Sequence, residues 1–322
     1  MAIPTRIGPY RIGRLRRTVL AALVGSAVVV PMAGAARPAA VPAPPPPSLG
    51  PLRAATCATD VAARFAANRD GVLAGERMAA GHGDRRRAAA LRALADPARN
   101  LLSFDGRDGG RSAEVFGDLC GAERIAVLVP GSDTSFEQYG RFQAGAEALS
   151  RRLGDRSAVV AWLGYPTPSM LGLSVLTARR AEAAAPALRA FVDEVSAVRP
   201  GARVSVLCHS YGSVVCASAA EGLAASDIVL FGSPGTGVDN VASLHTTAAV
   251  WAGRGAGDLI GRVPHVRLRL PFVTVGFGTD PVSPGFGAHV FAAGDSAHSD
   301  YLKAGSVSLD SIARIASGDN RA

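Results

Sequence analysis

The pentapeptide at positions 208–212 (Cys-His-Ser-Tyr-Gly) places a serine in a setting that suits nucleophilic catalysis. An apolar run typical of a strand precedes it, and a run typical of a helix follows it. A serine on such a strand–turn–helix junction sits in a strained backbone, so small residues are needed two positions before and after it. Gly212 meets the second requirement, whereas Cys208 stands in the first position. We therefore predict Ser210 as a nucleophile, against the simpler interpretation of an ordinary serine in a tight turn.

A serine hydroxyl attacks a carbonyl well only if a base removes its proton, and that base needs an acid to orient it. His298 follows the last predicted strand, and Asp258 lies in a glycine-rich loop after the strand before it. Asp280, in a Thr-Asp-Pro turn, and Asp239 are the competing acids. The competing histidines are His82, His209, His245, His265 and His289. Position along the chain favours His298 as the base and Asp258 as the acid.

The elements that must hold these residues alternate along the chain from residue 125 onward. There are six short apolar runs, at residues 125–129, 159–163, 204–207, 228–231, 248–251 and 290–292. Helical stretches at about 136–153, 177–198 and 211–224 separate the first four of these runs. This alternation predicts right-handed βαβ units and a parallel sheet. Two further short strands, 101–104 and 113–116, form a hairpin around a Gly/Asp turn. The total is eight strands.

Strand count, the position of Ser210 and the order of the residues after it resemble the α/β-hydrolase superfamily, and more narrowly an actinobacterial exported α/β-hydrolase family of unassigned function. The resemblance covers roughly residues 98–317, and the segments that carry it are Val129-Pro130-Gly131, 161–165, 209–213, 257–260, 278–281 and 298–301. It implies an α/β-hydrolase fold: a mostly parallel eight-stranded sheet flanked by helices. It also implies that Ser210, Asp258 and His298 form a catalytic triad.

The same resemblance implies two oxyanion-hole donors, the backbone N–H groups of Tyr211 and Ser132. Asp133 is an awkward neighbour there, because an anion would oppose a developing negative charge. Only residues 232–247 separate the sixth and seventh strands, whereas many relatives insert a helical lid at that point. We therefore expect no large lid insertion and an open serine, although residues 58–97 remain a candidate cover.

The net charge of +8 does not indicate nucleic-acid binding. Five arginines lie within the first seventeen residues, and without them the net charge is +3. No basic stripe with interleaved aromatic residues follows, so we expect no nucleic-acid partner. No H-E-x-x-H motif, paired C-x-x-C motif or phosphate-binding loop is present, so we expect no metal and no cofactor.

The first 35 residues have the pattern of an export signal: a basic region, an apolar stretch at 18–30 and an A-x-A-like site at 33–35. Arg16-Arg17 loosely resembles a twin-arginine signal, and an uncleaved membrane anchor is the alternative. A Pro/Ala-rich spacer (36–56) follows, which would allow proximity to a cell wall or membrane. A helical segment with two helices (57–98) and the hydrolase domain (99–322) complete the predicted organisation. The protein is thus expected to be secreted or extracytoplasmic.

Four cysteines in an exported chain allow three pairings. We favour a Cys57–Cys120 bridge, which would tie the N-terminal segment to the start of the main sheet. Cys208 and Cys216 flank Ser210, and the sequence leaves open whether they form a second bridge or two buried thiols.

Together these features predict an exported serine hydrolase that cleaves small-molecule or polymer-bound acyl esters through an acyl-enzyme. Two alternatives remain: an acyltransferase with the same triad, and a non-catalytic cell-wall-binding protein on a hydrolase scaffold.

Overall fold

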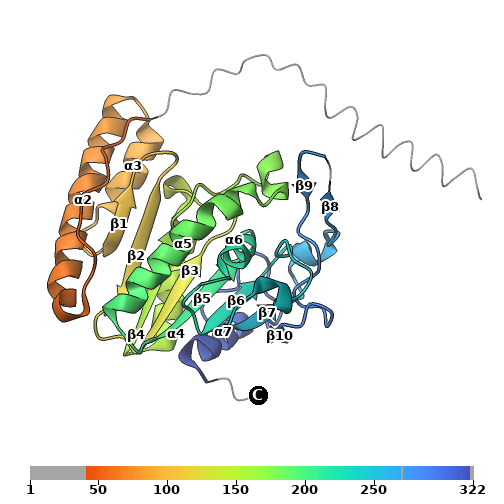
Figure 1. The fold of residues 1–322 in the computed structure, drawn as a ribbon. Helices are drawn as coiled ribbons and strands as arrows, with labels where there is room; N and C mark the ends of the chain where they lie inside the picture. The colour runs from red at the N-terminus through yellow and green to blue at the C-terminus, as the bar shows by residue number, and fades with distance from the viewer. Residues whose placement is uncertain (1–40, 270, 320–322) are drawn as a thin grey trace, which may run out of the picture. The chain divides into compact units, whose positions relative to one another are not determined.

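A computed structural model describes residues 41–269 and 271–319, so the predicted export signal (1–35) lies outside the described residues. The central sheet has eight strands: β1 (Leu101–Asp105), β2 (Arg111–Gly117), β3 (Arg124–Val129), β4 (Ser157–Leu163), β5 (Arg203–His209), β6 (Asp227–Phe231), β7 (Ala249–Gly253) and β10 (His289–Val290). Their order across the sheet is β1-β2-β4-β3-β5-β6-β7-β10. Figure 1 shows this sheet running through the middle of the described chain.

The sheet is antiparallel at one edge and parallel elsewhere. The β1–β2 and β2–β4 pairs are antiparallel, and the six strands from β4 to β10 are parallel to one another. Every residue of β4 and β6 is buried, as expected for strands that helices cover on both faces. The predicted fold class, a mostly parallel eight-stranded α/β-hydrolase sheet, is confirmed.

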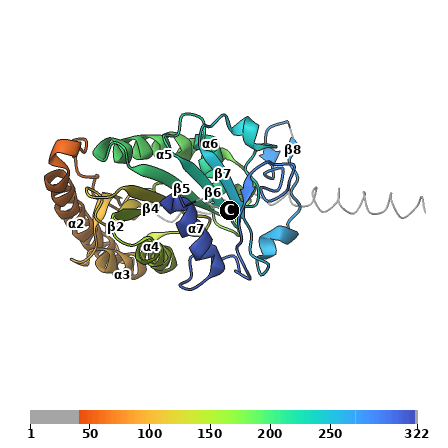
Figure 2. The ribbon, with the colours of Figure 1, turned by 90° about the horizontal axis from the view of Figure 1, so that it is seen from below.

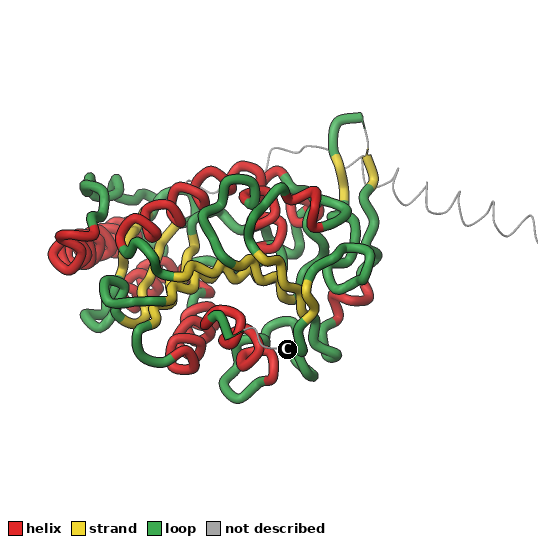
Figure 3. The backbone as a smooth tube through the Cα atoms, turned by 60° about the horizontal axis from the view of Figure 1, so that its bottom comes forward, coloured by secondary structure: helices red, strands yellow, loops and turns green. Residues whose placement is uncertain are grey.

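Helices cover both faces of the sheet. The helix α5 (Arg179–Val198) and the helix α6 (Gly212–Ala219) bury apolar residues in the cluster on one face. The helix α4 (Gly140–Leu153) and the helix α7 (Val307–Ser317) contribute to the cluster on the other face. Figure 2 shows α5 and α6 on the side opposite α4 and α7, and Figure 3 shows the sheet between these helical layers.

Two further helices, α2 (Cys57–Gly81) and α3 (Arg85–Leu94), pack at the β1 edge of the sheet (Figure 1). The buried Asn68 side chain donates a hydrogen bond to the carbonyl of Leu101 on β1 at 3.0 Å. The predicted Cys57–Cys120 disulfide is present and links the start of α2 to the loop that precedes β3. The two predicted helices of this segment therefore lie at the edge strand.

The connection between β6 and β7 is short, residues 232–248, as the sequence predicts. A longer excursion, residues 254–288, lies between β7 and β10. It contains a hairpin of two short strands, β8 (Leu268–Arg269) and β9 (Thr274–Val275), which the sequence analysis does not predict.

Residues 41–322 form one compact unit that holds both disulfides and all three clusters of buried apolar residues. We therefore expect this unit to fold on its own. Within the described part of the chain, no helix combines the length and apolar character needed to cross a membrane.

Candidate active site

Ser210 lies at the sharp turn between β5 and α6. Its backbone φ is +52°, a left-handed conformation that costs free energy for a residue other than glycine and is typical of functional sites. The turn is held closely against the loop after β3. A Cβ on Gly212 would lie 2.7 Å from the carbonyl oxygens of Val129 and Pro130, so only glycine fits there. The predicted strand–turn–helix context of the serine is therefore present.

Cys208 occupies the position where a small residue is expected, and the structure shows how its side chain is accommodated. Cys208 forms a disulfide with Cys216 on α6, so its side chain is part of a cross-link between the strand and the helix. The hydroxyl of Ser213 donates to the carbonyl of Cys208 at 3.2 Å. The strand and the helix on either side of Ser210 are therefore joined covalently, which resolves the choice that the sequence left open.

The structure brings Ser210, His298 and Asp258 together in a relay of hydrogen bonds. The Nε2 atom of His298 lies 2.9 Å from the Oγ atom of Ser210. Its Nδ1 atom lies 3.0 Å from each carboxylate oxygen of Asp258. This is the geometry in which an imidazole takes a proton from a serine while a carboxylate fixes its orientation and tautomer.

Asp258 is held by three donors. Its side chain accepts from the N–H of Ile260 at 2.8 Å and from the hydroxyl of Tyr301 at 2.7 Å, besides the imidazole. Burial alone would raise the pKa of Asp258, but the hydrogen bonds from His298, Ile260 and Tyr301 outweigh it and lower the pKa. Asp258 is therefore an anion at neutral pH, and its charge faces the imidazole.

The hydroxyl of Tyr301 is a part of the site to which the sequence analysis assigns no role. It accepts a hydrogen bond from the N–H of Gly255 at 3.0 Å while it donates to Asp258. Burial, and then the hydrogen bond to Asp258, raise the pKa of Tyr301, so it remains a donor at all ordinary pH values. Its position three residues after His298 is the only signal in the sequence, and it does not distinguish the side chain from a core tyrosine.

His209 supports the loop that carries His298. Its Nε2–H donates to the carbonyl oxygen of His298 at 2.7 Å. Burial, followed by the nearby His298, lowers the pKa of His209 to about 4. His209 is therefore neutral at physiological pH and acts through this hydrogen bond rather than through a charge.

The two competing acids and His289 are engaged elsewhere. Asp280 pairs with Arg254 at 2.5 Å, and Asp239 pairs with Arg267 at 2.7 Å. His289 lies in β10, where its ring packs on Trp251 with the centroids 4.8 Å apart. Of the sequence-derived acids and bases, His298 is hydrogen-bonded to Ser210, and Asp258 is hydrogen-bonded to His298.

The two backbone N–H groups predicted for the oxyanion hole have no backbone acceptor in the part of the chain that the structure describes. Within the described residues, neither the N–H of Tyr211 nor that of Ser132 donates to a backbone oxygen. The loop that carries Ser132 is tight against the serine, because a Cβ on Gly131 would lie 2.7 Å from the Cβ of Ser210. The hydroxyl of Tyr165 anchors this loop by donating to the carbonyl of Pro130 at 2.6 Å.

The carboxylate of Asp133 accepts a hydrogen bond from the N–H of Met170 at 3.2 Å, and the N–H of Asp133 donates to the carbonyl of Pro168 at 3.0 Å. This exposed side chain is thus bound to the loop after β4. Its structural role accounts for an acidic residue beside the proposed oxyanion donors.

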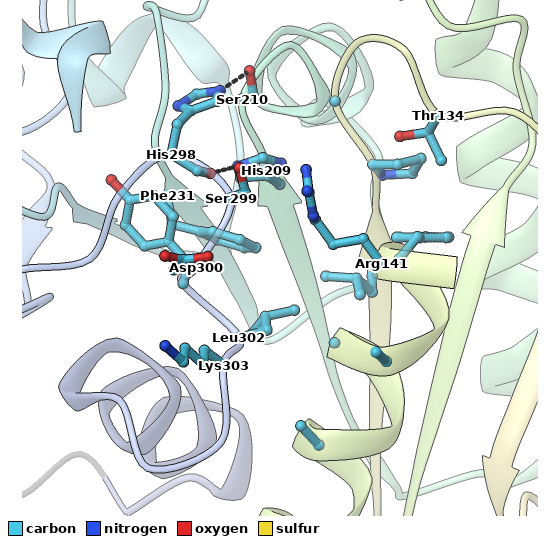
Figure 4. A pocket seen from close by; sticks show the side chains of 18 of the residues that line it. Thr134, Arg141, His209, Ser210, Phe231, His298, Ser299, Asp300, Leu302 and Lys303 are labelled. Atoms are coloured by element: carbon cyan, nitrogen blue, oxygen red, sulfur yellow. Dashed lines mark hydrogen bonds between the residues drawn. The ribbon is translucent and has the colours of Figure 1, made fainter. Parts of the chain in front are cut away.

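A pocket of about 830 Å³ opens in front of Ser210 and His298. Figure 4 shows these two residues at one end, Leu302 and Lys303 at the other, and Arg141 extending into the pocket from α4. No residue of the segment 58–97 lines this pocket, so the two N-terminal helices do not cover the serine. Within the described residues, no group of three or more His, Cys, Asp or Glu side chains is arranged to hold a metal ion.

Comparison with known families agrees with this architecture. The profile of a family described as alpha/beta hydrolase matches residues 105–268. The chain belongs to the alpha/beta hydrolase family. The match covers β2 to β7 and the turn that carries Ser210, and it ends before the segment that carries His298.

This hydrolase is similar to uncharacterized mycobacterial proteins. One from Mycobacterium tuberculosis is 32% identical over 251 residues, which cover 67% of this chain and 38% of that protein. One from Mycobacterium bovis is 33% identical over 186 residues, which cover 51% of this chain and 70% of that protein. The chain thus spans well under half the length of the first of these relatives.

Solved structures similar to this hydrolase include a serine hydrolase without a lid from Xanthomonas campestris, with a TM-score of 0.44 and 16% identity over 69% of this chain and 95% of that one. They also include an esterase from Mycobacterium marinum, with a TM-score of 0.41 and 14% identity over 78% of this chain and 89% of that one.

Proposed function

We propose that this hydrolase cleaves carboxylic esters through an acyl-enzyme on Ser210. The observation that carries the proposal is the relay from Ser210 Oγ through His298 to the buried carboxylate of Asp258, at 2.9 and 3.0 Å. Ser210 and His298 line a pocket large enough for a small-molecule acyl group.

In the first step, the Oγ atom of Ser210 attacks the ester carbonyl while Nε2 of His298 takes the hydroxyl proton. The N–H groups of Tyr211 and Ser132 stabilise the negative charge that develops on the carbonyl oxygen. The C–O bond of the ester then breaks, and His298 returns the proton to the departing alcohol. A water molecule, deprotonated by His298, attacks the acyl-enzyme in the same way, which releases the acid and restores Ser210.

Asp258 acts on this cycle by holding the imidazole, and Tyr301 by holding Asp258. The carboxylate stabilises the imidazolium that forms after each proton transfer. The short β6–β7 connection leaves the serine without a lid at that position, and this favours small-molecule or polymer-bound acyl esters as substrates. The two disulfides are compatible with catalysis outside the cytoplasm, and secretion is part of the proposal.

The test is hydrolysis of a chromogenic short-chain ester by wild type and Ser210→Ala, with Ser317→Ala at the C-terminal end of α7 as a matched control. Removing a serine nucleophile lowers kcat by about 10⁶-fold in a well-studied triad, so Ser210→Ala is expected to fall to background. The control is expected to match wild type. Undiminished hydrolysis by a folded Ser210→Ala variant would refute the proposal.

A further inference from the structure

Large apolar side chains are exposed in two neighbouring loops on the catalytic side of the sheet. Nine of the thirteen exposed large apolar residues within the described part of the chain lie in the β4–α5 loop and in the β7–β10 excursion. Leu171 and Phe272 are each 101% exposed, and Leu173 is 82% exposed. Monomeric soluble proteins rarely present such a concentration of apolar surface without a use for it. We call this surface the apolar rim, with the residues Met170, Leu171, Leu173, Leu259, Leu268 and Phe272.

The two loops are joined to each other and to the pocket. The N–H of Gly276, just after β9, donates to the carbonyl of Leu176 at 2.9 Å. Met170 is 55% exposed and also lines the pocket in front of Ser210. Leu259 directly follows Asp258 and is 64% exposed. The apolar rim is therefore continuous with the proposed active site.

The charge in and beside these loops is predominantly positive. The β4–α5 loop has no charged residue and leads into Arg179 and Arg180 at the start of α5. The excursion 254–288 contains two aspartates, Asp258 and Asp280, which are bonded to His298 and Arg254. It also contains four arginines, at positions 254, 262, 267 and 269. Arg267 is paired with Asp239, whereas Arg179 and Arg262 are exposed and make no ion pair within the described residues. Exposed apolar side chains beside arginines are the composition of a segment that binds at the surface of anionic lipids.

The shape of the apolar rim also favours a lipid surface, rather than a second protein, as the partner. Figure 1 shows the β8–β9 hairpin standing out from the body of the domain, with the loop before α5 near it. Side chains that are fully exposed on a projecting hairpin and loop are suited to insertion between lipid headgroups, whereas a second protein copy would need a complementary groove.

We propose that the apolar rim docks this hydrolase on a lipid surface that carries anionic headgroups, so that Ser210 meets acyl esters presented by that surface. The substrate part of this inference rests on the proposed ester hydrolysis. Leu171, Leu173 and Phe272 insert into the lipid, and Arg179 and Arg262 contact the headgroups.

The test is flotation of the unit comprising residues 41–322 with phosphatidylcholine vesicles that contain or lack phosphatidylglycerol. This unit excludes the apolar stretch at 18–30, which would bind vesicles by itself. Leu171→Ser and Phe272→Ser are each expected to lower the vesicle partition coefficient about tenfold, the value of roughly one apolar anchor. Arg262→Gln is expected to weaken binding only to vesicles that contain phosphatidylglycerol. Met78→Ser, which changes an exposed methionine on α2, is the matched control and is expected to bind like wild type.

Equal vesicle binding by wild type, Leu171→Ser and Phe272→Ser would overturn the inference. It would also be overturned if wild type failed to bind vesicles and instead formed a dimer that these two variants abolish. Labelling of wild-type Ser210 by a soluble serine probe, measured without lipid, separates the two proposals. Binding without labelling would count against ester hydrolysis alone, and labelling without binding would count against lipid docking alone.

Discussion

Gly131 sets the position of Ser210 relative to the proposed oxyanion hole, so Gly131→Ala is a sensitive test of that geometry. The added Cβ would lie 2.7 Å from the Cβ of Ser210, 3.2 Å from its Oγ and 3.2 Å from the carbonyl oxygen of His209. An ordinary contact begins at 3.4 Å, so the loop and the serine must separate by about 0.7 Å. A displacement of about 1 Å costs roughly 10²-fold in rate when catalytic groups must be aligned. We therefore expect kcat/KM for a short-chain ester to fall by about 10- to 100-fold.

The assay compares Gly131→Ala with Gly81→Ala, whose Cβ would meet no atom within 4 Å at the end of α2. The control is expected to keep wild-type kcat/KM, and both variants are expected to retain their fold by circular dichroism. A Gly131→Ala protein with wild-type kcat/KM would refute the inference that the loop after β3 contributes to the reaction.

Three further predictions concern stability and titration. Removing the Cys57–Cys120 disulfide should lower the free energy of unfolding by about 4 kcal/mol, and removing Cys208–Cys216 should lower it by about 2.5 kcal/mol, because the two bridges close loops of 63 and 8 residues. Denaturant unfolding of variants with both cysteines of a bridge replaced by serine measures these losses. A larger loss on removing Cys208–Cys216 than on removing Cys57–Cys120 would contradict the prediction. The pKa of Asp258 is lowered in the folded state, so the ionised carboxylate stabilises the fold above the usual pKa of 3.8, and this stabilisation is lost as the pH falls below 3.8. On acidification from pH 5 to pH 3, the Asp258→Asn variant should therefore lose less stability than wild type. The pKa of His209 is lowered in the folded protein from 6.5 to about 4, so on acidification the unfolded state binds a proton first. The free energy of unfolding should therefore fall by up to about 3 kcal/mol between pH 6.5 and pH 4, and His209→Gln should remove this pH dependence. A titration midpoint for His209 near 6.5, measured by NMR, would contradict the prediction.

The sequence predicts the sheet well because its signals are local. The apolar runs of β3 to β7 are five to seven residues long, and helices separate the runs from β3 to β6, a pattern that leaves few topologies open. β8 and β9 are two residues long, too short for any periodicity to show, so the sequence does not predict their hairpin. α7 is also missed, although Ser306 caps it by accepting from the N–H of Leu309.

Candidate site residues are predicted where chain order constrains them. The order of Ser210, Asp258 and His298 along the chain, combined with a parallel sheet, places all three at the same edge. The choice between Asp258 and Asp280 needs the structure, because both follow β7 and only spatial contacts show that Asp280 pairs with Arg254. The Tyr301 hydroxyl, a further side-chain donor to Asp258, has no sequence pattern of its own, since a buried tyrosine near a core helix is common.

The pairing of Cys208 with Cys216 is likewise a matter of geometry. Two cysteines eight residues apart on a strand and a helix can bond only if the turn between them brings their side chains together. That turn is the one that carries Ser210, so the disulfide depends on the same local fold as the candidate nucleophile.

The most direct test of the central claim is the intact mass of the protein after treatment with a fluorophosphonate serine probe, beside the Ser210→Ala variant. One adduct on wild type and none on the variant is the predicted result, because the probe reacts with a serine that a base activates. An unlabelled wild-type protein with intact fold would contradict the account and would favour a non-catalytic role for this α/β-hydrolase scaffold.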